Sequence, residues 1–341
     1  MDNAVQDIRW GMIGVGSVAE HKSGPAFAQA KGGRLAGVAS RRADAAADYA
    51  ARHGVERVFD TPTALIESNE IDAVYIATPP ASHAALALQV ARANKPCCIE
   101  KPMTVLYPDA EEIRDVFAAA GIPLFVSYYR RSLPRFLQVA QWIGQHPIGA
   151  IREVAWVLKR TASASAPGTA QHWRIDAREA PGGLFEDLAC HGLDLFDLLL
   201  GPILRIEHAR LSATDAAADV PDRVQATWRH GGDIRGVGDW DFAAAERADT
   251  VIITGDAGTI RFSMFENMPL ELIRGGDTLR RSIDHPVPIQ LHHVEAMNAH
   301  LRNGPPHPST GDSALRTAWA TDTILRGPAT EIAGFRLSRP D

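Results

Sequence analysis

The sequence predicts an N-terminal α/β domain built on a doubly wound parallel sheet, followed by an α+β C-terminal domain with a large open antiparallel sheet. From Ile8 to about Ser127, short apolar runs alternate with alanine-rich helical stretches. After Arg131, β-like runs follow one another with short polar turns. At 341 residues the chain is longer than one hydrophobic core usually supports. We therefore expect two domains, formed by residues 1–127 and 128–341.

In the first domain, apolar runs predict strands at 8–13, 35–39, 73–77, 97–99 and 124–126. Apolar residues at i, i+3 and i+4 predict helices at 43–53, 82–93 and 109–120. Strands and helices that alternate in this way are typical of a parallel sheet with helices on both faces.

In the second domain the same patterns predict helices at 133–143 and 183–200, a strand at 151–159 and a loop at 161–170. Further β-like runs lie at 203–211, 223–228, 233–242, 250–254, 259–262 and 270–273. Polar turns such as 230–232 and 255–258 separate them, which is typical of antiparallel strands. Helices at 292–302 and 312–325 are expected to pack back on the body.

The composition favours chemistry on small molecules. The net charge of −6 provides no positive field for nucleic acid, and no run of 18 apolar residues could cross a bilayer. The first seven residues lack the parts of a secretory signal, so we expect a cytoplasmic protein. Cys97, Cys98 and Cys190 are too few and too poorly spaced for a disulfide framework or a zinc knuckle. We expect small-molecule substrates and other subunits as partners, without nucleic acid, membrane or metal.

A glycine turn directly follows the first strand. Residues 14–19 read Gly-Val-Gly-Ser-Val-Ala, and these glycines allow a tight turn and let a pyrophosphate approach backbone N–H groups. The turn stands at the first strand end of a βαβ pattern, which is the context that a dinucleotide-binding (Rossmann) domain requires. We expect Gly14, Gly16, Ser17 and Val18 to bind the cofactor. A merely structural turn is the alternative.

Residues 40–42, at the end of the second strand, bear on the choice between NAD and NADP. An acidic residue there would bind the ribose 2′-OH of NAD, but this chain has Ser40, Arg41 and Arg42. A hydroxyl and two guanidinium groups suit a 2′-phosphate, because arginine pairs with phosphate oxygens bidentately. We expect Ser40 and Arg41 to bind the cofactor and NADP to be preferred over NAD. Alternatively, the arginines begin a solvated helix and Arg41 stacks on adenine.

Lys101 is the candidate catalytic lysine. It stands just past the buried strand at 97–99, where open α/β sheets bind ligands, and Pro102 fixes its backbone. We expect Glu100 and Lys101 at the cofactor site. The alternative is an ordinary solvated lysine that opens a loop.

The turn after the strand at 73–77 carries further cofactor candidates. They are Thr78, Pro79 and His83, and the two prolines at 79 and 80 stiffen the turn. For His83, local hydrogen bonds at the start of a helix are an equally good interpretation.

The helix predicted at 183–200 carries a polar face among apolar neighbours. Asp187 and His191 are spaced i, i+4, and Asp194 follows three residues later. A histidine can give and take a proton near neutral pH, and a carboxylate can orient it. Catalysis, a satisfied polar cluster and a metal site are the three interpretations. A metal is disfavoured because no third strong ligand of obvious spacing stands beside the pair.

Taken in order, these motifs and Trp173-Arg174 resemble the glucose-fructose oxidoreductase, inositol 2-dehydrogenase and rhizopine-catabolism (Gfo/Idh/MocA) family over nearly the full length. Members are NAD(P)-dependent oxidoreductases of sugars, cyclitols and related polyols. The resemblance implies that Lys101 hydrogen-bonds the reacting oxygen, that His191 is the general acid/base, and that Asp187 positions substrate and histidine. It also implies subunit contacts through the C-terminal sheet, as in a homodimer or homotetramer. The expected substrate-binding residues are Lys101, Tyr129, Arg131, Trp173, Arg174, Asp187 and His191.

Two segments depart from a simple pattern. Residues 20–25 interrupt the helix expected after the glycine turn, so we expect the first helix to begin only near Pro25, with Lys22 near the cofactor or the cleft. The cluster at 128–131 is suited to substrate hydroxyls, to a substrate carboxylate or to a plain hinge anchor.

These observations favour a dehydrogenase or reductase that interconverts a hydroxyl and a carbonyl by hydride transfer. The alternatives are a redox-neutral enzyme with tightly held NAD and a non-catalytic nucleotide-sensing regulator. Intact Lys101, Asp187 and His191 argue against the regulator, because a silent binder has no need for all three.

Overall fold

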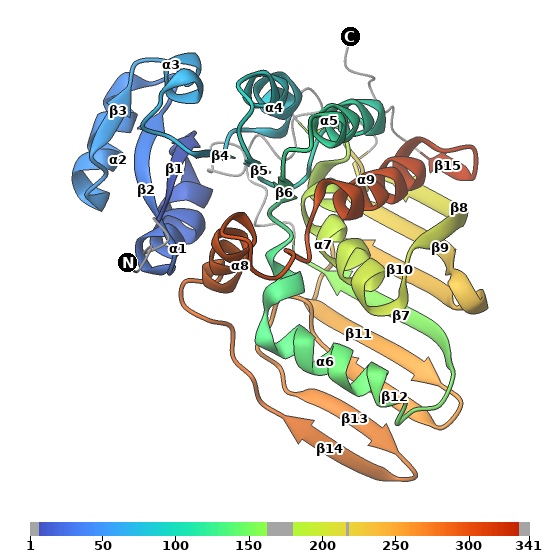
Figure 1. The fold of residues 1–341 in the computed structure, drawn as a ribbon. Helices are drawn as coiled ribbons and strands as arrows, with labels where there is room; N and C mark the ends of the chain where they lie inside the picture. The colour runs from blue at the N-terminus through green and yellow to red at the C-terminus, as the bar shows by residue number, and fades with distance from the viewer. Residues whose placement is uncertain (1–6, 162–179, 216–217, 334–341) are drawn as a thin grey trace. The chain divides into compact units, whose positions relative to one another are not determined.

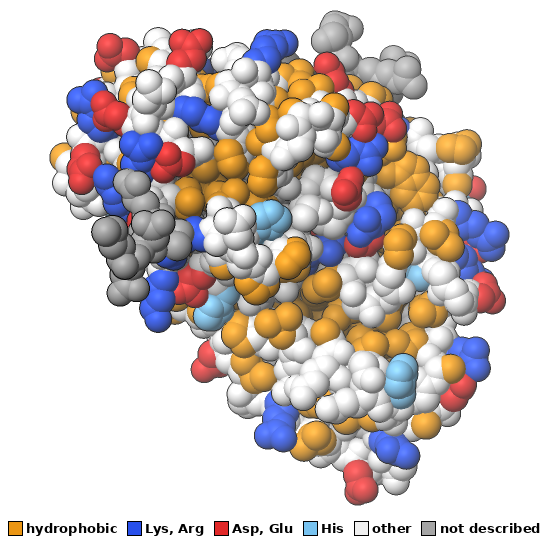
Figure 2. Space-filling view, viewed as in Figure 1, with side chains coloured by type: hydrophobic (Ala, Val, Ile, Leu, Met, Phe, Trp, Pro, Cys, Tyr) orange, Lys and Arg blue, Asp and Glu red, His pale blue; other side chains and the backbone are white. Residues whose placement is uncertain are grey.

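The computed structural model describes residues 7–161, 180–215 and 218–333, and the chain divides into two compact units. The first unit is formed by the chain up to Leu133 together with Pro286–Leu315. The second is formed by Pro134–His285 and the chain from Arg316 onward. On the face shown in Figure 2, acidic and basic side chains are interspersed rather than gathered by sign. Within the described ranges, no helix combines the length and apolar character needed to cross a membrane.

The first unit is built on a six-stranded sheet in the order β3-β2-β1-β4-β5-β6 (Figure 1). Every neighbouring pair in it is parallel, which confirms the predicted doubly wound sheet. Its strands are β1 (Ile8–Ile13), β2 (Gly33–Ala39), β3 (Arg57–Phe59), β4 (Ala73–Ile76), β5 (Cys97–Ile99) and β6 (Leu124–Val126).

Helices cover both faces of this sheet. Trp10 of β1 packs in one core cluster with Phe27, Tyr49 and Met297, which come from three different helices. Gly11 points to the opposite face, where a Cβ would lie only 2.6 Å from the Leu65 side chain. The helices are α1 (Gly24–Gln29), α2 (Ala43–His53), α3 (Pro62–Glu67), α4 (His83–Arg92), α5 (Tyr107–Ala120) and α8 (Leu291–Leu301).

The second unit is built on a nine-stranded sheet in the order β14-β13-β12-β11-β7-β10-β9-β8-β15. Most pairs are antiparallel, as predicted, but β7 pairs with β10 and β8 with β15 in parallel, so the sheet is mixed. Its strands are β7 (Ile151–Lys159), β8 (Ile203–Ser212), β9 (Arg223–His230), β10 (Arg235–Asp241), β11 (Ala248–Gly255), β12 (Gly258–Phe262), β13 (Leu270–Arg274), β14 (Asp277–Arg281) and β15 (Thr330–Ala333).

An aromatic layer joins this sheet to α7 (Gly183–Leu200). The Trp156 ring lies edge-on to those of Phe196 and Trp240, at 6.0 and 5.6 Å between centroids. A Cβ at Gly192 of α7 would lie 2.2 Å from the Trp156 ring, so the helix needs glycine to rest on it. The remaining helices are α6 (Pro134–Gly144) and α9 (Gly311–Arg326), and α9 carries residues of both units.

Among the α-helices and strands given above, α3 and the short strands β3, β14 and β15 were not predicted. The residues of β14 are exposed throughout, and those of β3 are exposed or half-buried. A strand without a buried face has no alternation of apolar and polar residues to reveal it.

Candidate active site

The glycine turn joins the carboxyl ends of β1, β2 and β4. Gly14 donates its N–H to the Ala39 carbonyl at 2.8 Å, and a Cβ on Gly14 would lie 2.8 Å from the Ala77 carbonyl oxygen. Its φ of +98° also favours glycine. A Cβ at Gly16, by contrast, would meet no atom within 4 Å, so packing inside the protein does not require glycine there. Gly16 is exposed, so a ligand can approach its backbone closely, as binding of a pyrophosphate would require.

The segment before α1 differs from one expectation. α1 begins at Gly24, near Pro25 as expected, but helical residues precede it from Ser17 onward, and Ala19–Ser23 forms a π-turn. Gly24 donates its N–H to the Ala19 carbonyl, five residues earlier, before α1 continues. Proline lacks the N–H that the next regular helical bond would need, and a one-residue insertion accommodates this break without ending the helix.

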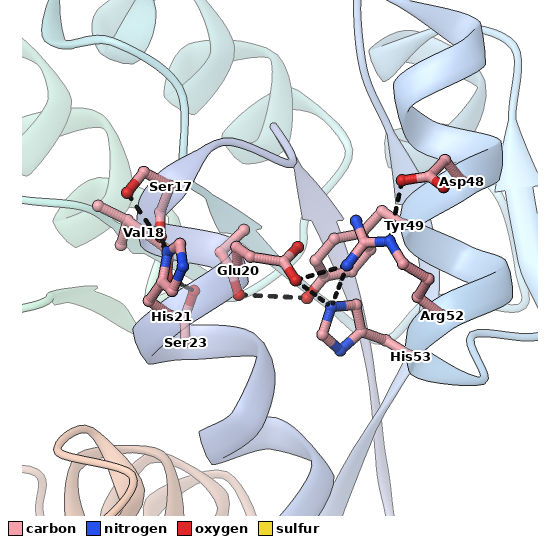
Figure 3. Close-up of polar contacts among 10 residues, drawn as sticks. Ser17, Val18, Glu20, His21, Ser23, Asp48, Tyr49, Arg52 and His53 are labelled. Atoms are coloured by element: carbon pink, nitrogen blue, oxygen red, sulfur yellow. Dashed lines mark hydrogen bonds and ion pairs between the residues drawn. The ribbon is translucent and has the colours of Figure 1, made fainter. Parts of the chain in front are cut away.

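Side chains of α2 hold the π-turn in place (Figure 3). The Tyr49 hydroxyl donates to the Ala19 carbonyl at 3.3 Å, and the Arg52 guanidinium forms an ion pair with Glu20. His53 Nε2 lies 3.1 Å from the same Glu20 oxygen. The hydrogen bond from Arg52 lowers the pKa of the Glu20 carboxyl.

Residues 40–42 lie beside the glycine turn, because Ala39 accepts the N–H of Gly14. The Ser40 hydroxyl oxygen accepts the backbone N–H of Arg42 at 3.3 Å, which fixes the bend before α2. The side chains of Arg41 and Arg42 are exposed. This segment therefore offers a hydroxyl and two guanidinium groups to a ligand at the surface.

The turn after β4 is tied to the turn after β5 by His83. The ring is fully buried, with Nε2 at 2.9 Å from the Thr78 carbonyl oxygen and Nδ1 at 3.0 Å from that of Pro102. Burial lowers the pKa of His83, although these backbone contacts oppose the shift. Ser82 donates its hydroxyl to Thr78 Oγ1 or to the Pro79 carbonyl, at 2.8 and 2.9 Å.

The first unit carries a group of cations near the buried phenol of Tyr129, which is 3% exposed. Burial alone would raise the pKa of Tyr129, but the positive charges of Arg130, Lys22 and Lys101 outweigh burial and lower it. The Arg130 guanidinium carbon lies 5.0 Å from the ring centroid of Tyr129. Arg131, also buried, donates through Nη1 to the Pro308 carbonyl at 3.3 Å.

The second unit carries Asp187 and His191 on α7. They are 8% and 3% exposed, and the His191 ring lies edge-on to Phe265 at 6.0 Å between centroids. Asp194, fully buried further along the helix, accepts a hydrogen bond from the Thr317 hydroxyl at 3.2 Å. The polar residues of α7 are thus held inside the unit, as their apolar neighbours predicted.

The structure brings the predicted cofactor residues together at the carboxyl ends of β1, β2, β4 and β5 in the first unit. The predicted pair Asp187 and His191 lies in the second unit. Trp173 and Arg174 lie outside the described residues. Sequence reasoning missed Tyr75 and Gln290, which contact Glu100 from strand β4 and from the residue before α8. Their types and neighbours gave no signal, because each reads as part of an ordinary core.

Comparison with known proteins decides the family. Residues 8–128 match the Gfo/Idh/MocA oxidoreductase family with its NAD-binding Rossmann fold, and residues 136–261 match the Gfo/Idh/MocA C-terminal domain. The chain belongs to the Gfo/Idh/MocA family. Membership confirms the predicted resemblance, the enzyme class of oxidoreductase and a nicotinamide dinucleotide as cofactor.

Individual Gfo/Idh/MocA relatives are moderately similar. Oxidoreductase P35 of Formosa agariphila is 34% identical over 260 residues, covering 76% of this chain and 80% of that protein. Inositol 2-dehydrogenase of Rhizobium meliloti is 34% identical over 202 residues, covering 57% of this chain and 55% of that protein. A solved levoglucosan dehydrogenase in complex with NADH and levoglucosan has a TM-score of 0.84 at 22% identity, covering 95% and 98% of the two chains.

Proposed function

We propose that this Gfo/Idh/MocA chain interconverts a hydroxyl and a carbonyl on a sugar, a cyclitol or a related polyol, by hydride transfer with a nicotinamide cofactor. The names of its relatives, which include an inositol dehydrogenase and a levoglucosan dehydrogenase, support this substrate class. The position of Lys101 carries the proposal. It lies two residues past the end of β5, and β4 is the only strand between β5 and β1, which carries the glycine turn.

Each proposed catalytic residue has one task. Lys101 donates a hydrogen bond to the reacting oxygen, and its charge stabilises the negative charge that develops there. His191 takes the proton of the hydroxyl during oxidation and returns it during reduction. Asp187, one helical turn earlier, orients the imidazole and positions the substrate. The bound nicotinamide accepts or supplies the hydride.

The substrate hydroxyls are bound by further side chains in this proposal. The cations around Tyr129 lower the pKa of its phenol, and the phenol oxygen can accept a hydrogen bond from a sugar hydroxyl. Arg131, Trp173 and Arg174 complete the set that the family resemblance implies.

Residues 1–127 bind the cofactor, which we propose to be NADP in preference to NAD, and residues 128–341 bind substrate. Ser40 and Arg41 offer a hydroxyl and a guanidinium group beside the glycine turn and present no carboxylate to a 2′-phosphate. Buried His83 and Glu100 support the two turns that reach the cofactor. The other residues of the proposed cofactor site are Gly14, Gly16, Ser17, Val18, Thr78, Pro79 and Lys101.

We also propose that the enzyme acts in the cytoplasm as a homodimer or homotetramer. Its cysteines are free thiols, even the adjacent Cys97 and Cys98, which suits a reducing compartment. Alternate residues of β7, β9 and β10 leave one face of the large sheet partly accessible, with charged pairs such as Arg235–Glu153 at 2.9 Å. Such a face can join two copies by reciprocal contacts. Light scattering during size-exclusion chromatography measures the assembly directly.

A substrate panel tests the function. Sugars, cyclitols and sugar acids are mixed with enzyme and NADP⁺ or NAD⁺, and both reduced cofactor and organic product are quantified. We expect stoichiometric cofactor reduction with at least one member of the panel. Turnover without net cofactor change would indicate a redox-neutral reaction instead, and cofactor binding without turnover on any member would contradict the proposal.

A further inference from the structure

Glu100 lies at the centre of a buried hydrogen-bond cluster in the first unit. Glu100 is only 5% exposed. Oxygen Oε1 accepts the Tyr75 hydroxyl at 2.6 Å and the Gln290 amide Nε2 at 3.0 Å. Oxygen Oε2 accepts the backbone N–H of Lys101 at 3.1 Å. Both oxygens therefore have donors, as a buried carboxylate requires.

Tyr75 and Gln290 are themselves fixed. Both residues are fully buried, and the Tyr75 hydroxyl lies 2.9 Å from Ser127 Oγ and 3.1 Å from Gln290 Oε1. Burial, followed by the neighbouring Glu100 charge, raises the pKa of Tyr75 well above its usual value, so its hydroxyl stays a donor. The Tyr75 and Phe27 rings pack in a T-shaped arrangement with 5.3 Å between their centroids.

Burying a cluster of polar groups costs the free energy of removing them from water. Replacing such groups by apolar residues of similar volume is often neutral or stabilising, so stability alone gives no reason to keep them here. The cluster instead fixes the position of the groups next to Lys101. It orients the carboxylate that holds the amide of Lys101, while His83 holds the carbonyl of the next residue, Pro102, at 3.0 Å.

We propose that Tyr75 and Gln290 are positioning residues for Lys101, which they hold in place through the Glu100 carboxylate. The proposal rests on the catalytic role proposed above for Lys101. Fixing its backbone on both sides sets the point from which the long side chain reaches the reacting oxygen. Geometry of this kind matters because a displacement of about 1 Å at a reacting group can cost on the order of 10² in rate.

Amide hydrogen exchange at single-residue resolution tests the cluster without any turnover. In Tyr75→Phe and in Gln290→Leu, we expect the Lys101 amide to exchange at least about tenfold faster, because its acceptor is no longer held. The Glu100 amide is the internal reference, since it donates to the Ile76 carbonyl at 2.9 Å and not to this cluster. Equal acceleration of both amides, or none at Lys101, would overturn the proposal.

Tyr49→Phe is the matched control for the exchange experiment. It removes another fully buried phenol of the same unit, whose hydroxyl donates to Ala19 and does not touch Glu100. We expect it to leave exchange at Lys101 unchanged. If Gln290→Leu proves insoluble, Tyr75→Phe, which keeps the ring and its packing, gives the result alone.

Kinetics in two backgrounds test the consequence for catalysis. Tyr75→Phe should lower kcat about tenfold in the otherwise wild-type enzyme, with cofactor Kd within about twofold, yet leave the residual rate of Lys101→Met unchanged. The same loss in both backgrounds would show that Tyr75 does not act through Lys101 and would overturn the positioning role. Wild-type kcat in Lys101→Met alone would instead refute the catalytic role proposed for Lys101, and the exchange result would still decide whether the cluster holds the Lys101 amide.

Discussion

The Glu186 carboxyl accepts a hydrogen bond of 3.1 Å from the backbone N–H of Gly182 at the start of α7. Burial raises the pKa of Glu186 to about 7, and the charge of Arg326 offsets only part of this rise. The helix that carries Asp187 and His191 therefore begins at a carboxyl group that titrates near neutral pH.

This titration predicts a pH-dependent stability. The folded-state pKa is above the unfolded value, so the stabilisation is fully present below about pH 4.5 and is lost as the pH rises through about 7. Between pH 4 and pH 8 the wild type should lose roughly 3 kcal/mol of unfolding free energy relative to Glu186→Gln, or less if the site relaxes. Urea denaturation of both proteins at several pH values measures the difference. A difference that does not change with pH would refute the assigned titration.

Lys101→Ala should lower kcat by at least about 10² while cofactor affinity changes little, because the variant loses a charge aimed at the reacting oxygen. Steady-state rates and cofactor titration measure the two effects separately. Lys31→Ala, at an exposed position in the same unit, is the control and should keep the wild-type rate. A Lys101→Ala enzyme with normal turnover would contradict the catalytic role.

His191 and Asp187 should act as a unit. Each single change to alanine should cost roughly 10² to 10⁴ in kcat, and the double variant should cost far less than the product of the two losses. Rates of the four proteins form a double-mutant cycle. Independent multiplication of the losses, or recovery of activity with added zinc, would mean that these roles are wrong.

The sequence predicted best those elements that are buried on a defined face. The bounds of β1, β5 and α7 agree with the expected ranges because β1 and β5 are short, mostly apolar runs and the apolar residues of α7 recur at helical spacing. The order in which the strands pair could not be predicted from local patterns. The parallel pairing of β7 with β10 depends on which strand inserts beside which, and no local pattern records that.

The residues of the candidate site likewise include some that the sequence revealed and some that it did not. Gly14 and Lys101 were found because chemistry at a strand end leaves a local signature. Tyr75 and Gln290 are 215 positions apart and meet only because the chain returns to the first unit at Pro286–Leu315. The π-turn at Ala19–Ser23 was missed because Pro25 predicts a break, whereas an inserted residue lets the helix continue.

His307 should make the first unit sensitive to acid. Burial lowers its pKa to about 4, and its ring lies edge-on to His293 at 4.7 Å between centroids. Because the folded value is below the unfolded one, its stabilisation is present above about pH 6.5 and is lost as the pH falls through about 4. His307→Asn keeps an acceptor for the Ser309 N–H and should unfold more easily than wild type at pH 7, with a difference that shrinks towards pH 4. Thermal unfolding at both pH values decides this, and a constant difference would count against it.

The last prediction concerns cofactor choice. Ser40, Arg41 and Arg42 provide no carboxylate that would bind a ribose diol and repel a 2′-phosphate. A hydrogen bond between arginine and an ionised phosphate contributes about 1.5 to 3 kcal/mol, so NADP should bind at least roughly tenfold more tightly than NAD. Ser40→Asp combined with Arg41→Ala should reverse this order, whereas Arg92→Ala, at an exposed arginine of α4, should preserve it. Titration of both cofactors by intrinsic tryptophan fluorescence gives the two Kd values. Equal or tighter binding of NAD by the wild type would mean that Arg41 stacks on adenine or faces solvent and does not bind phosphate.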